Sequence, residues 1–261
     1  MDLGLRDRVF VVTGGSRGLG LATAQALVAE GARVVVVARD EQVIAEAVEG
    51  LGGHDVAVGL PGDLADPSTA ERVVAAAVAR YGRLDGAMVS VGGPAAGTPM
   101  TTDDDVWRQA FESVFLGSLR IVRATSNAMG SSPDQQSGTA GSILLMLSTS
   151  AREVLTGLAV SNGLRPGLAM LVKDLADELA PRGIRVNGLL PGSAATDRRF
   201  ALDARFGAPD MVRRRNESAI PLGRYAEPSE VGSVAAFLLS PTASYVTGAL
   251  VTVDGGASRS I

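Results

Sequence analysis

A glycine-rich segment near the start of the chain constrains the fold more than any other feature. The segment Thr13–Gly20 follows the apolar run Arg8–Val12 and precedes an alanine-rich stretch. Its spaced glycines are Gly14, Gly18 and Gly20. A strand, a glycine turn and a helix in this order are typical of a dinucleotide-binding fold. Glycines let the backbone approach a pyrophosphate closely, and the N-terminus of the helix offers free N–H groups. The segment therefore predicts a nucleotide site.

Short apolar runs alternate with stretches of helical apolar spacing along almost the whole chain. The candidate strands are Val9–Thr13, Arg33–Ala38, Val56–Leu60, Gly86–Val91, Ser142–Leu147, Arg185–Leu190 and Ala249–Val253. The candidate helices are Leu19–Glu30, Asp40–Leu51, Pro67–Tyr81, Asp104–Met129, Thr156–Ala180 and Glu227–Leu239. This alternation indicates βαβ units, and the unbroken hydrophobicity of Val34–Val37 indicates a sheet covered on both faces. The pattern predicts a three-layer, doubly wound α/β Rossmann fold with a seven-stranded parallel sheet.

Length and composition limit the remaining classes of function. The 261 residues are 46% hydrophobic and 20% charged, as expected for one globular domain spanning 1–261. A formal net charge of −4 disfavours a nucleic-acid partner. Without cysteine, and with the single histidine His54, a disulfide framework, a thiolate nucleophile and a histidine or cysteine metal site are excluded. No apolar stretch is long enough for a membrane span, so we expect a cytoplasmic protein.

Two segments depart from the alternation. Gly130–Gly141 is rich in serine, glycine, proline and glutamine, which predicts an exposed loop. Residues 193–222 follow a late strand, and an insertion there lies near the carboxyl edge of the sheet, where ligands bind. We therefore expect a substrate lid over 193–222. Its arginines are Arg198, Arg199, Arg205, Arg213, Arg214 and Arg215. A solvated face of mixed charge is the simpler interpretation, and attraction of an anionic acyl thioester is the alternative.

Further motifs follow in a fixed order. They are Thr13-Gly14-x-x-x-Gly18-x-Gly20, Asp63-Leu64, Trp107, Gly141-Ser142-Ile143, Glu178–Asn187, Pro191-Gly192 with Thr196, and Val253–Gly256. Together they resemble the short-chain dehydrogenase/reductase family of NAD(P)-dependent Rossmann oxidoreductases, over essentially the whole length. The resemblance implies a small-molecule substrate and a homotetramer or homodimer, with Asp104–Met129 and Thr156–Ala180 packed between subunits.

The chain departs from the family at the catalytic tetrad of asparagine, serine, tyrosine and lysine. Ser148 retains the serine position. The tyrosine position, thirteen residues later, is Ser161, and the lysine position is Arg165. Val114 stands at the asparagine position, and Val89–Gly92 replaces the family's Asn-Asn-Ala-Gly segment. The resemblance therefore implies an atypical active site made of Ser148, Ser161 and Arg165.

The cofactor half of the site looks intact. By resemblance, the cofactor-binding residues are Gly14, Ser16, Arg17, Gly18, Leu19, Gly20, Arg39, Asp63, Leu64, Gly92, Arg165, Pro191, Gly192 and Thr196. NAD is selected by an acidic residue at the end of the second strand, but this chain has Arg39 there and Arg17 in the glycine loop. Two guanidinium groups suit a 2′-phosphate. We therefore expect NADP(H), the alternative being two solvated surface arginines.

The catalytic chemistry allows two hypotheses. The first is an NADP(H)-dependent oxidoreductase acting on a carbonyl or alcohol, similar to a 3-oxoacyl reductase. Ser161 is a far weaker acid than tyrosine, and Arg165 would supply an oxyanion-stabilising charge, beside a possible kink at Pro166. An activated double bond or imine would tolerate the loss of the tyrosine better. The second is an NADP(H)-binding pseudoenzyme that serves as a sensor or structural subunit.

Other proton donors are less favoured. Tyr81 and Tyr225 are expected to pack in the core or on the surface, and His54 to lie in an exposed loop. Glu153 follows Ser148 on a loop expected to border the substrate, but it would act as an acid only if burial raised its pKa.

Overall fold

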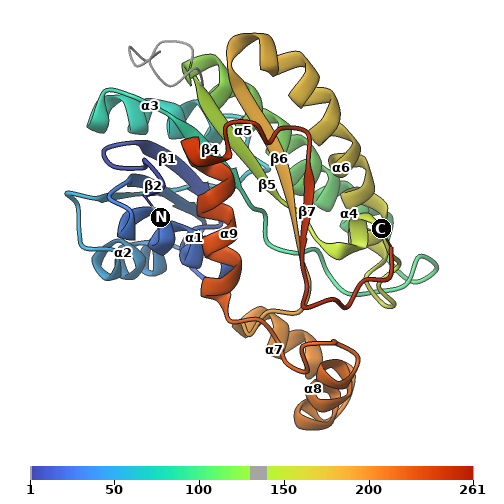
Figure 1. The fold of residues 1–261 in the computed structure, drawn as a ribbon. Coiled ribbons are helices and arrows are strands. Elements are labelled where there is room, and N and C mark those ends of the chain that lie inside the picture. The colour runs from blue at the N-terminus through green and yellow to red at the C-terminus, as the bar shows by residue number, and fades with distance from the viewer. Residues whose placement is uncertain (1, 130–139, 261) are drawn as a thin grey trace.

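The computed structural model describes residues 2–129 and 140–260 and contains one parallel sheet between two layers of helices (Figure 1). The strand order is β3-β2-β1-β4-β5-β6-β7. The strands are β1 (Val9–Thr13), β2 (Arg33–Ala38), β3 (Ala57–Pro61), β4 (Gly86–Val89), β5 (Gly141–Met146), β6 (Ile184–Pro191) and β7 (Leu250–Val253). Every neighbouring pair is parallel. The predicted three-layer, seven-stranded Rossmann fold is therefore confirmed.

The helices cover both faces of this sheet. They are α1 (Gly18–Ala29), α2 (Glu41–Gly50), α3 (Thr69–Tyr81), α4 (Asp104–Ala110), α5 (Gly117–Met129), α6 (Ala159–Leu179), α7 (Asp197–Asp203), α8 (Pro209–Ser218) and α9 (Pro228–Leu239). Because side chains alternate along a strand, Val11 and Val35 join the core beneath α3, α5 and α6. Val12 and Val34 join the core beneath α1, α2 and α9. The strands are thus buried on both faces, as their unbroken hydrophobicity predicts.

Three segments differ in detail from the sequence-based expectation. The expected single helix Asp104–Met129 is interrupted by a π-helical stretch at Phe111–Leu116. The helix α6 continues through Pro166, which lies in its interior. The expected loop Gly130–Gly141 falls largely outside the described residues, and its last residue already belongs to β5.

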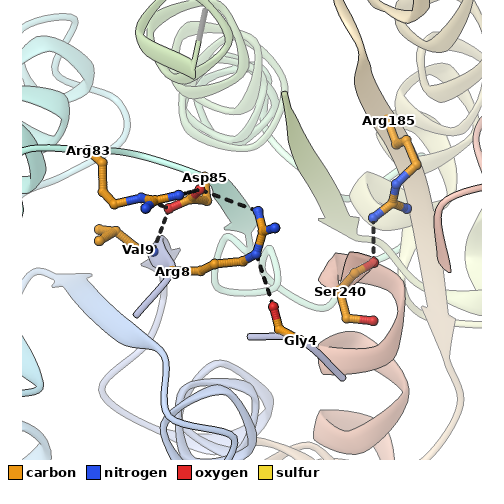
Figure 2. Close-up of polar contacts among 7 residues, drawn as sticks. All are labelled: Gly4, Arg8, Val9, Arg83, Asp85, Arg185 and Ser240. Atoms are coloured by element: carbon orange, nitrogen blue, oxygen red, sulfur yellow. Dashed lines mark hydrogen bonds and ion pairs between the residues drawn. The ribbon is translucent and has the colours of Figure 1, made fainter. Parts of the chain in front are cut away.

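Polar contacts fix the amino ends of the strands (Figure 2). Asp85 is 3% exposed and accepts hydrogen bonds from Val9 N–H (2.8 Å) and from the Arg83 guanidinium (2.6 and 2.8 Å). Arg8 lies 3.5 Å from the same carboxylate. At the start of β6, Arg185 donates to backbone carbonyls at the C-terminus of α9, including that of Ser240 (2.9 Å), where a cation complements the helix dipole. These contacts anchor the strands at the end opposite to the ligand edge.

At the carboxyl edge, a reciprocal contact joins β1 to the segment after β4. The Thr13 hydroxyl donates to the Ser90 carbonyl oxygen (2.7 Å) and accepts from the Ser90 N–H (2.8 Å). These neighbouring strands, β1 and β4, are where the chain reverses its direction of winding, and such a switch point is where open α/β sheets bind ligands.

Candidate active site

The glycine segment forms a cradle without side chains. Gly14 and Gly18 have φ of +61° and +54°, which glycine adopts readily. A Cβ at Gly20 would lie 2.0 Å from the carbonyl oxygen of Gly14, so a side chain there is excluded. Arg17 precedes the first turn of α1 and its side chain does not cap the helix. The cradle and the uncapped N–H groups suit a pyrophosphate.

The other residues expected around the cofactor lie along the carboxyl edge of the sheet. Thr196 lies over the glycine loop, because its Cγ2 is 3.5 Å from where a Cβ of Gly18 would stand. At Gly92, after β4, a Cβ would meet nothing within 4 Å. Pro191 ends β6, and a Cβ at Gly192 would lie 2.6 Å from the Asp254 side chain. These residues thus follow the carboxyl ends of β4 and β6, and Thr196 reaches the glycine loop.

Asp63 and Leu64 lie after β3. The exposed Asp63 carboxylate accepts a hydrogen bond from Ala65 N–H (2.9 Å). Leu64 is buried, and its carbonyl oxygen is 2.5 Å from the position of a Cβ at Gly117. Leu64 therefore sets the packing of this loop against α5, while Asp63 stays accessible at the edge.

The two arginines expected to bind the 2′-phosphate of the ribose are both accessible to a ligand. Arg17 and Arg39 are exposed, and no ion pair among the described residues includes either of them. Asp40 follows Arg39, but its carboxylate accepts the hydrogen bond of Val43 N–H (3.2 Å) and caps α2. Asp40, the acidic side chain nearest the end of β2, is thus engaged in capping α2.

The serines at the site form a pair that the sequence did not indicate. Ser161, which the resemblance aligns with the tyrosine, lies 2.8 Å (Oγ to Oγ) from the buried Ser150 hydroxyl. Ser148 accepts a hydrogen bond from Ser150 N–H (3.1 Å) and begins a short helical turn. Among the described residues, no acceptor for the Ser148 hydroxyl proton is present, so that proton can point to a ligand. Ser150 connects the two expected serines.

Arg165 is the most unusual group at the site. Only 5% of it is exposed, and it donates to the carbonyl oxygens of Met146 (2.9 Å) and Val91 (3.4 Å), at the ends of β5 and β4. Its Nε has no hydrogen-bond partner among the described residues. Burial, with a contribution from the nearby charge of Arg198, lowers the pKa of Arg165 to about 10. The guanidinium is still protonated at neutral pH, so a buried positive charge lies at the carboxyl edge.

Val114, which the resemblance aligns with the asparagine, provides no polar side-chain group. It lies in the π-helical stretch between α4 and α5, and its side chain is 2% exposed within the apolar core. The Val114 carbonyl oxygen accepts a hydrogen bond from the Ser118 hydroxyl (2.6 Å). The π-helical backbone, a feature often found at functional sites, is therefore present here, but an asparagine side chain is not.

The segment 193–222 contains α7 and α8, which follow the carboxyl end of β6. Arg198 donates to the Pro94 carbonyl oxygen (3.0 Å), and its guanidinium occupies the place a Cβ of Gly93 would take. The Phe206 ring lies 3.0 Å from the position of a Cβ at Gly157. Arg198 is thus exposed, in keeping with a solvated charged face, while its guanidinium contacts the loop that follows β4.

Among the less favoured proton donors, Glu153 and Tyr225 already form hydrogen bonds with other residues. Glu153 accepts hydrogen bonds from the backbone N–H groups of Ser260 and Arg259, and these lower its pKa, opposite to what a general acid needs. The Tyr225 hydroxyl donates to the buried Asp203 carboxylate (2.8 Å). Tyr81 packs against the core, and His54 is exposed.

Within residues 2–129 and 140–260, no group of three or more histidine, cysteine, aspartate or glutamate side chains could hold a metal ion. None of the helices in that part of the chain is both long and apolar enough to cross a bilayer.

Comparison with known proteins agrees with this geometry. Residues 14–258 match a family model described as enoyl-(acyl carrier protein) reductase. The chain is 34% identical to the L-rhamnose 1-dehydrogenase (NAD(P)(+)) of Azotobacter vinelandii, over 97% of both chains. Among solved structures, L-sorbose reductase of Gluconobacter frateurii, complexed with NADPH and L-sorbose, is 28% identical with a TM-score of 0.91 over 100% of both chains. A variant of actinorhodin polyketide ketoreductase with NADPH is 30% identical with a TM-score of 0.89, over 97% of this chain and 98% of that one. The fold, the nucleotide cradle and these matches show that the chain is an oxidoreductase of the short-chain dehydrogenase/reductase family.

Proposed function

We propose that the protein is an NADP(H)-dependent reductase of conjugated carbonyl compounds. Residues 1–261 would form one cofactor-binding domain, with 193–222 as its substrate lid. The observation that carries the proposal is Arg165, a buried guanidinium at the ends of β4 and β5 with an unpartnered Nε. A fixed charge of this kind stabilises negative charge that develops during a reaction. Residue 161 is a serine, so no phenol is available there to donate a proton.

The cofactor preference rests on the exposed arginines near β2. Arg17 and Arg39 are free of described ion pairs, and Asp40 is engaged in capping α2. An exposed guanidinium suits a 2′-phosphate, while the ribose of NAD would lack its acidic partner. The NADPH complexes of the two structural relatives agree with this choice.

The residue roles follow from the negative charge that develops on the substrate during the reaction. NADPH supplies a hydride, and its addition to the far carbon of a conjugated carbonyl leaves negative charge on the carbonyl oxygen. Arg165 stabilises that charge, and Ser148 orients the oxygen through its unassigned hydroxyl proton. Water then protonates the carbon next to the carbonyl, so the reaction consumes one NADPH and one proton. Ser161, held by Ser150, lines the site without acting as the acid.

A simple ketone is the poorer substrate. Its oxygen must be protonated directly, and a general acid typically contributes ~10²–10⁴-fold to such a step. Neither Ser161 nor Arg165 donates a proton readily at neutral pH. The tyrosine's absence therefore penalises ketone reduction more than reduction of a conjugated double bond.

A matched substrate pair tests the proposal. NADPH consumption is measured with benzylideneacetone and with its saturated analogue benzylacetone. We expect consumption with the first, giving the saturated ketone, at a rate at least ~10²-fold above the second. Arg165→Met should lower the rate ~10²–10³-fold, and Ser161→Ala should change it little. No consumption above background across a panel of conjugated carbonyls would contradict the proposal.

The alternative is a nucleotide-binding sensor or structural subunit, favoured by one observation: the Ser161 hydroxyl is already bonded to Ser150. It predicts tight NADPH binding without consumption. The double variant Ser161→Tyr with Arg165→Lys separates the two hypotheses, since ketone reduction by that variant requires a usable pocket. We also propose a cytoplasmic homotetramer or homodimer, which light scattering of the purified protein would test.

A further inference from the structure

The residues that follow β7 contact the end of the segment 193–222. These residues, 254–260, are called the strap below. The Gly255 carbonyl oxygen accepts a hydrogen bond from Leu222 N–H (3.2 Å). A Cβ at Gly255 would lie 2.7 Å from the Ile220 side chain, and φ is +67° there, so glycine suits this close contact. The strap therefore begins against the end of the proposed lid.

The other end of the strap is held by Glu153. Its Oε1 accepts hydrogen bonds from the backbone N–H groups of Arg259 (2.5 Å) and Ser260 (2.6 Å). Glu153 belongs to the loop between β5 and α6, and the red trace after β7 runs to that loop in Figure 1. Hydrogen bonds from N–H groups to an ionised carboxylate are about twice as strong as neutral ones. Glu153 is therefore a firm attachment point for the strap.

A local turn and a contact with β7 order the strap between its ends. The Asp254 carboxylate accepts a hydrogen bond from Ser258 N–H (2.7 Å). Arg152, next to Glu153, donates to the Leu250 carbonyl oxygen (3.1 Å) in β7. The loop after β5 thus contacts both the strand before the strap and the end of the strap.

Glu153 also ends a turn that carries two serines of the site. In this turn, residues 148–153, the Glu153 N–H donates to the Thr149 carbonyl oxygen (3.0 Å), and the Ser150 N–H donates to the Ser148 hydroxyl oxygen (3.1 Å). The backbone of Glu153 is thus bonded into the turn while its side chain holds the strap. A displacement of Glu153 would therefore move the backbone that places Ser148 and Ser150.

We propose that Glu153 is a positioning residue of the active site: its carboxylate fixes the turn 148–153 by holding the strap, which contacts the end of the lid. The part played by Ser148 and Ser150 in the reaction rests on the proposed function, but the link between the strap and the turn does not. Glu153 acts through these serines and donates no proton itself. The nucleotide cradle lies between β1 and α1 and has no part in these contacts.

Substitutions on both sides of the contact test the proposal. Both hydrogen bonds go to one oxygen, so Glu153→Gln keeps an acceptor there, whereas Glu153→Met removes it at similar side-chain length. Arg259→Pro removes one of the two donors and leaves Glu153 unchanged, and Arg259→Ala, which keeps the N–H, is its matched control. Glu49→Met removes an exposed carboxylate on α2 and controls for the loss of charge.

Amide hydrogen exchange of the whole protein measures the opening of each segment. In Glu153→Met and Arg259→Pro, exchange should rise at least about 10-fold in the strap and about threefold in residues 148–153, because charge-assisted hydrogen bonds are lost. Glu153→Gln keeps two weaker bonds, so its effect should be at least about threefold smaller than that of Glu153→Met. Arg259→Ala and Glu49→Met should exchange like the unmodified protein.

Kinetics and cofactor binding separate positioning from a general loss of structure. The kcat for benzylideneacetone should fall about 10–100-fold in Glu153→Met and Arg259→Pro, since small displacements of site residues have effects of this size. The Kd for NADPH, measured by fluorescence, should stay within about twofold, because the cradle is not involved. Glu153→Gln should restore most of the lost kcat.

Other results overturn the proposal. Unchanged exchange in residues 148–153, or an unchanged kcat in an active enzyme, would show that Glu153 anchors only the strap. Equal effects of Glu153→Gln and Glu153→Met, or of Arg259→Pro and Arg259→Ala, would exclude the hydrogen bonds as the cause. Faster exchange throughout the chain would indicate a merely structural role. Faster exchange of both segments in a protein that never consumes NADPH would instead contradict the reductase function and leave the link between strap and turn standing.

Discussion

Removing both arginines near β2 is the most informative perturbation of cofactor choice. In the variant Arg17→Gln with Arg39→Gln, the glycine cradle and the start of α1 stay unchanged, because neither side chain caps a helix or forms an ion pair among the described residues. Any loss of affinity would therefore report the contact with the nucleotide and not a collapse of the loop.

The magnitude follows from the exposure of the two side chains. A hydrogen bond to a charged group contributes about 1.5–3 kcal/mol, and solvent screening at exposed positions favours the lower end. Two such contacts give about 3 kcal/mol, which corresponds to a Kd for NADPH about 100-fold higher. NADH has no 2′-phosphate, so its affinity should change by less than about threefold.

Fluorescence titrations with NADPH and NADH measure both affinities in the same variant, so NADH acts as the internal control. The NADPH affinity of the unmodified protein should also fall as salt is raised, because the contact is electrostatic. An equal loss for both nucleotides would refute the reasoning, since it would place the arginines at the pyrophosphate. Unchanged NADPH binding would show that they remain in solvent.

Three further predictions concern the cradle and the stability of the fold. Gly20→Ala should weaken NADPH binding by at least ~100-fold, since its Cβ would overlap the loop backbone; Gly50→Ala, where a Cβ meets nothing within 4 Å, should leave binding unchanged in the same titration. Asp85→Asn should lower the free energy of unfolding by about 3 kcal/mol and Tm by about 6–12 °C in calorimetry; Asp105→Asn, in an exposed pair, should cost under about 1 kcal/mol. Hydrogen bonds from a guanidinium and a backbone N–H lower the pKa of Glu230 from 4.5 to about 2, so its contribution to stability is present above pH 4.5 and lost towards pH 2. Glu230→Gln should therefore make Tm fall less steeply across that range, and an unchanged slope would contradict this assignment.

The sheet could be predicted because its strands carry their own signal. A strand buried on both faces must be apolar at consecutive positions, so Val34–Val37 identify β2 without reference to the rest of the chain. The glycine motif fixes the first βαβ unit for a similar reason, since Gly20 tolerates no side chain against Gly14. These elements are determined by the chemistry of their own residues, so the sequence alone predicts them.

Elements that depend on tertiary contacts were predicted less well. The π-helical stretch at Phe111–Leu116 has the same apolar periodicity as the helices on either side of it. Pro166 suggests a kink, but α6 continues through it, because packing against β6 can override a single missing hydrogen bond. Charge content predicts a mixed surface for residues 193–222 but does not predict which arginine contacts the loop after β4.

The site's unusual chemistry arises from contacts between distant segments. Sequence spacing predicts that Ser161 and Arg165 stand at the tyrosine and lysine positions, but the Ser150 hydroxyl that meets Ser161 differs from Ser148 by only two positions, and spacing alone cannot choose between them. Arg198 resembles the other five arginines of the insertion, and its contact with Gly93 and Pro94 arises only in the folded chain. The structure places the Ser161 hydroxyl beside that of Ser150 and buries the Arg165 guanidinium at the ends of β4 and β5. Such an arrangement stabilises anions more readily than it donates protons, which supports the proposed addition of hydride to an acceptor that can delocalise negative charge.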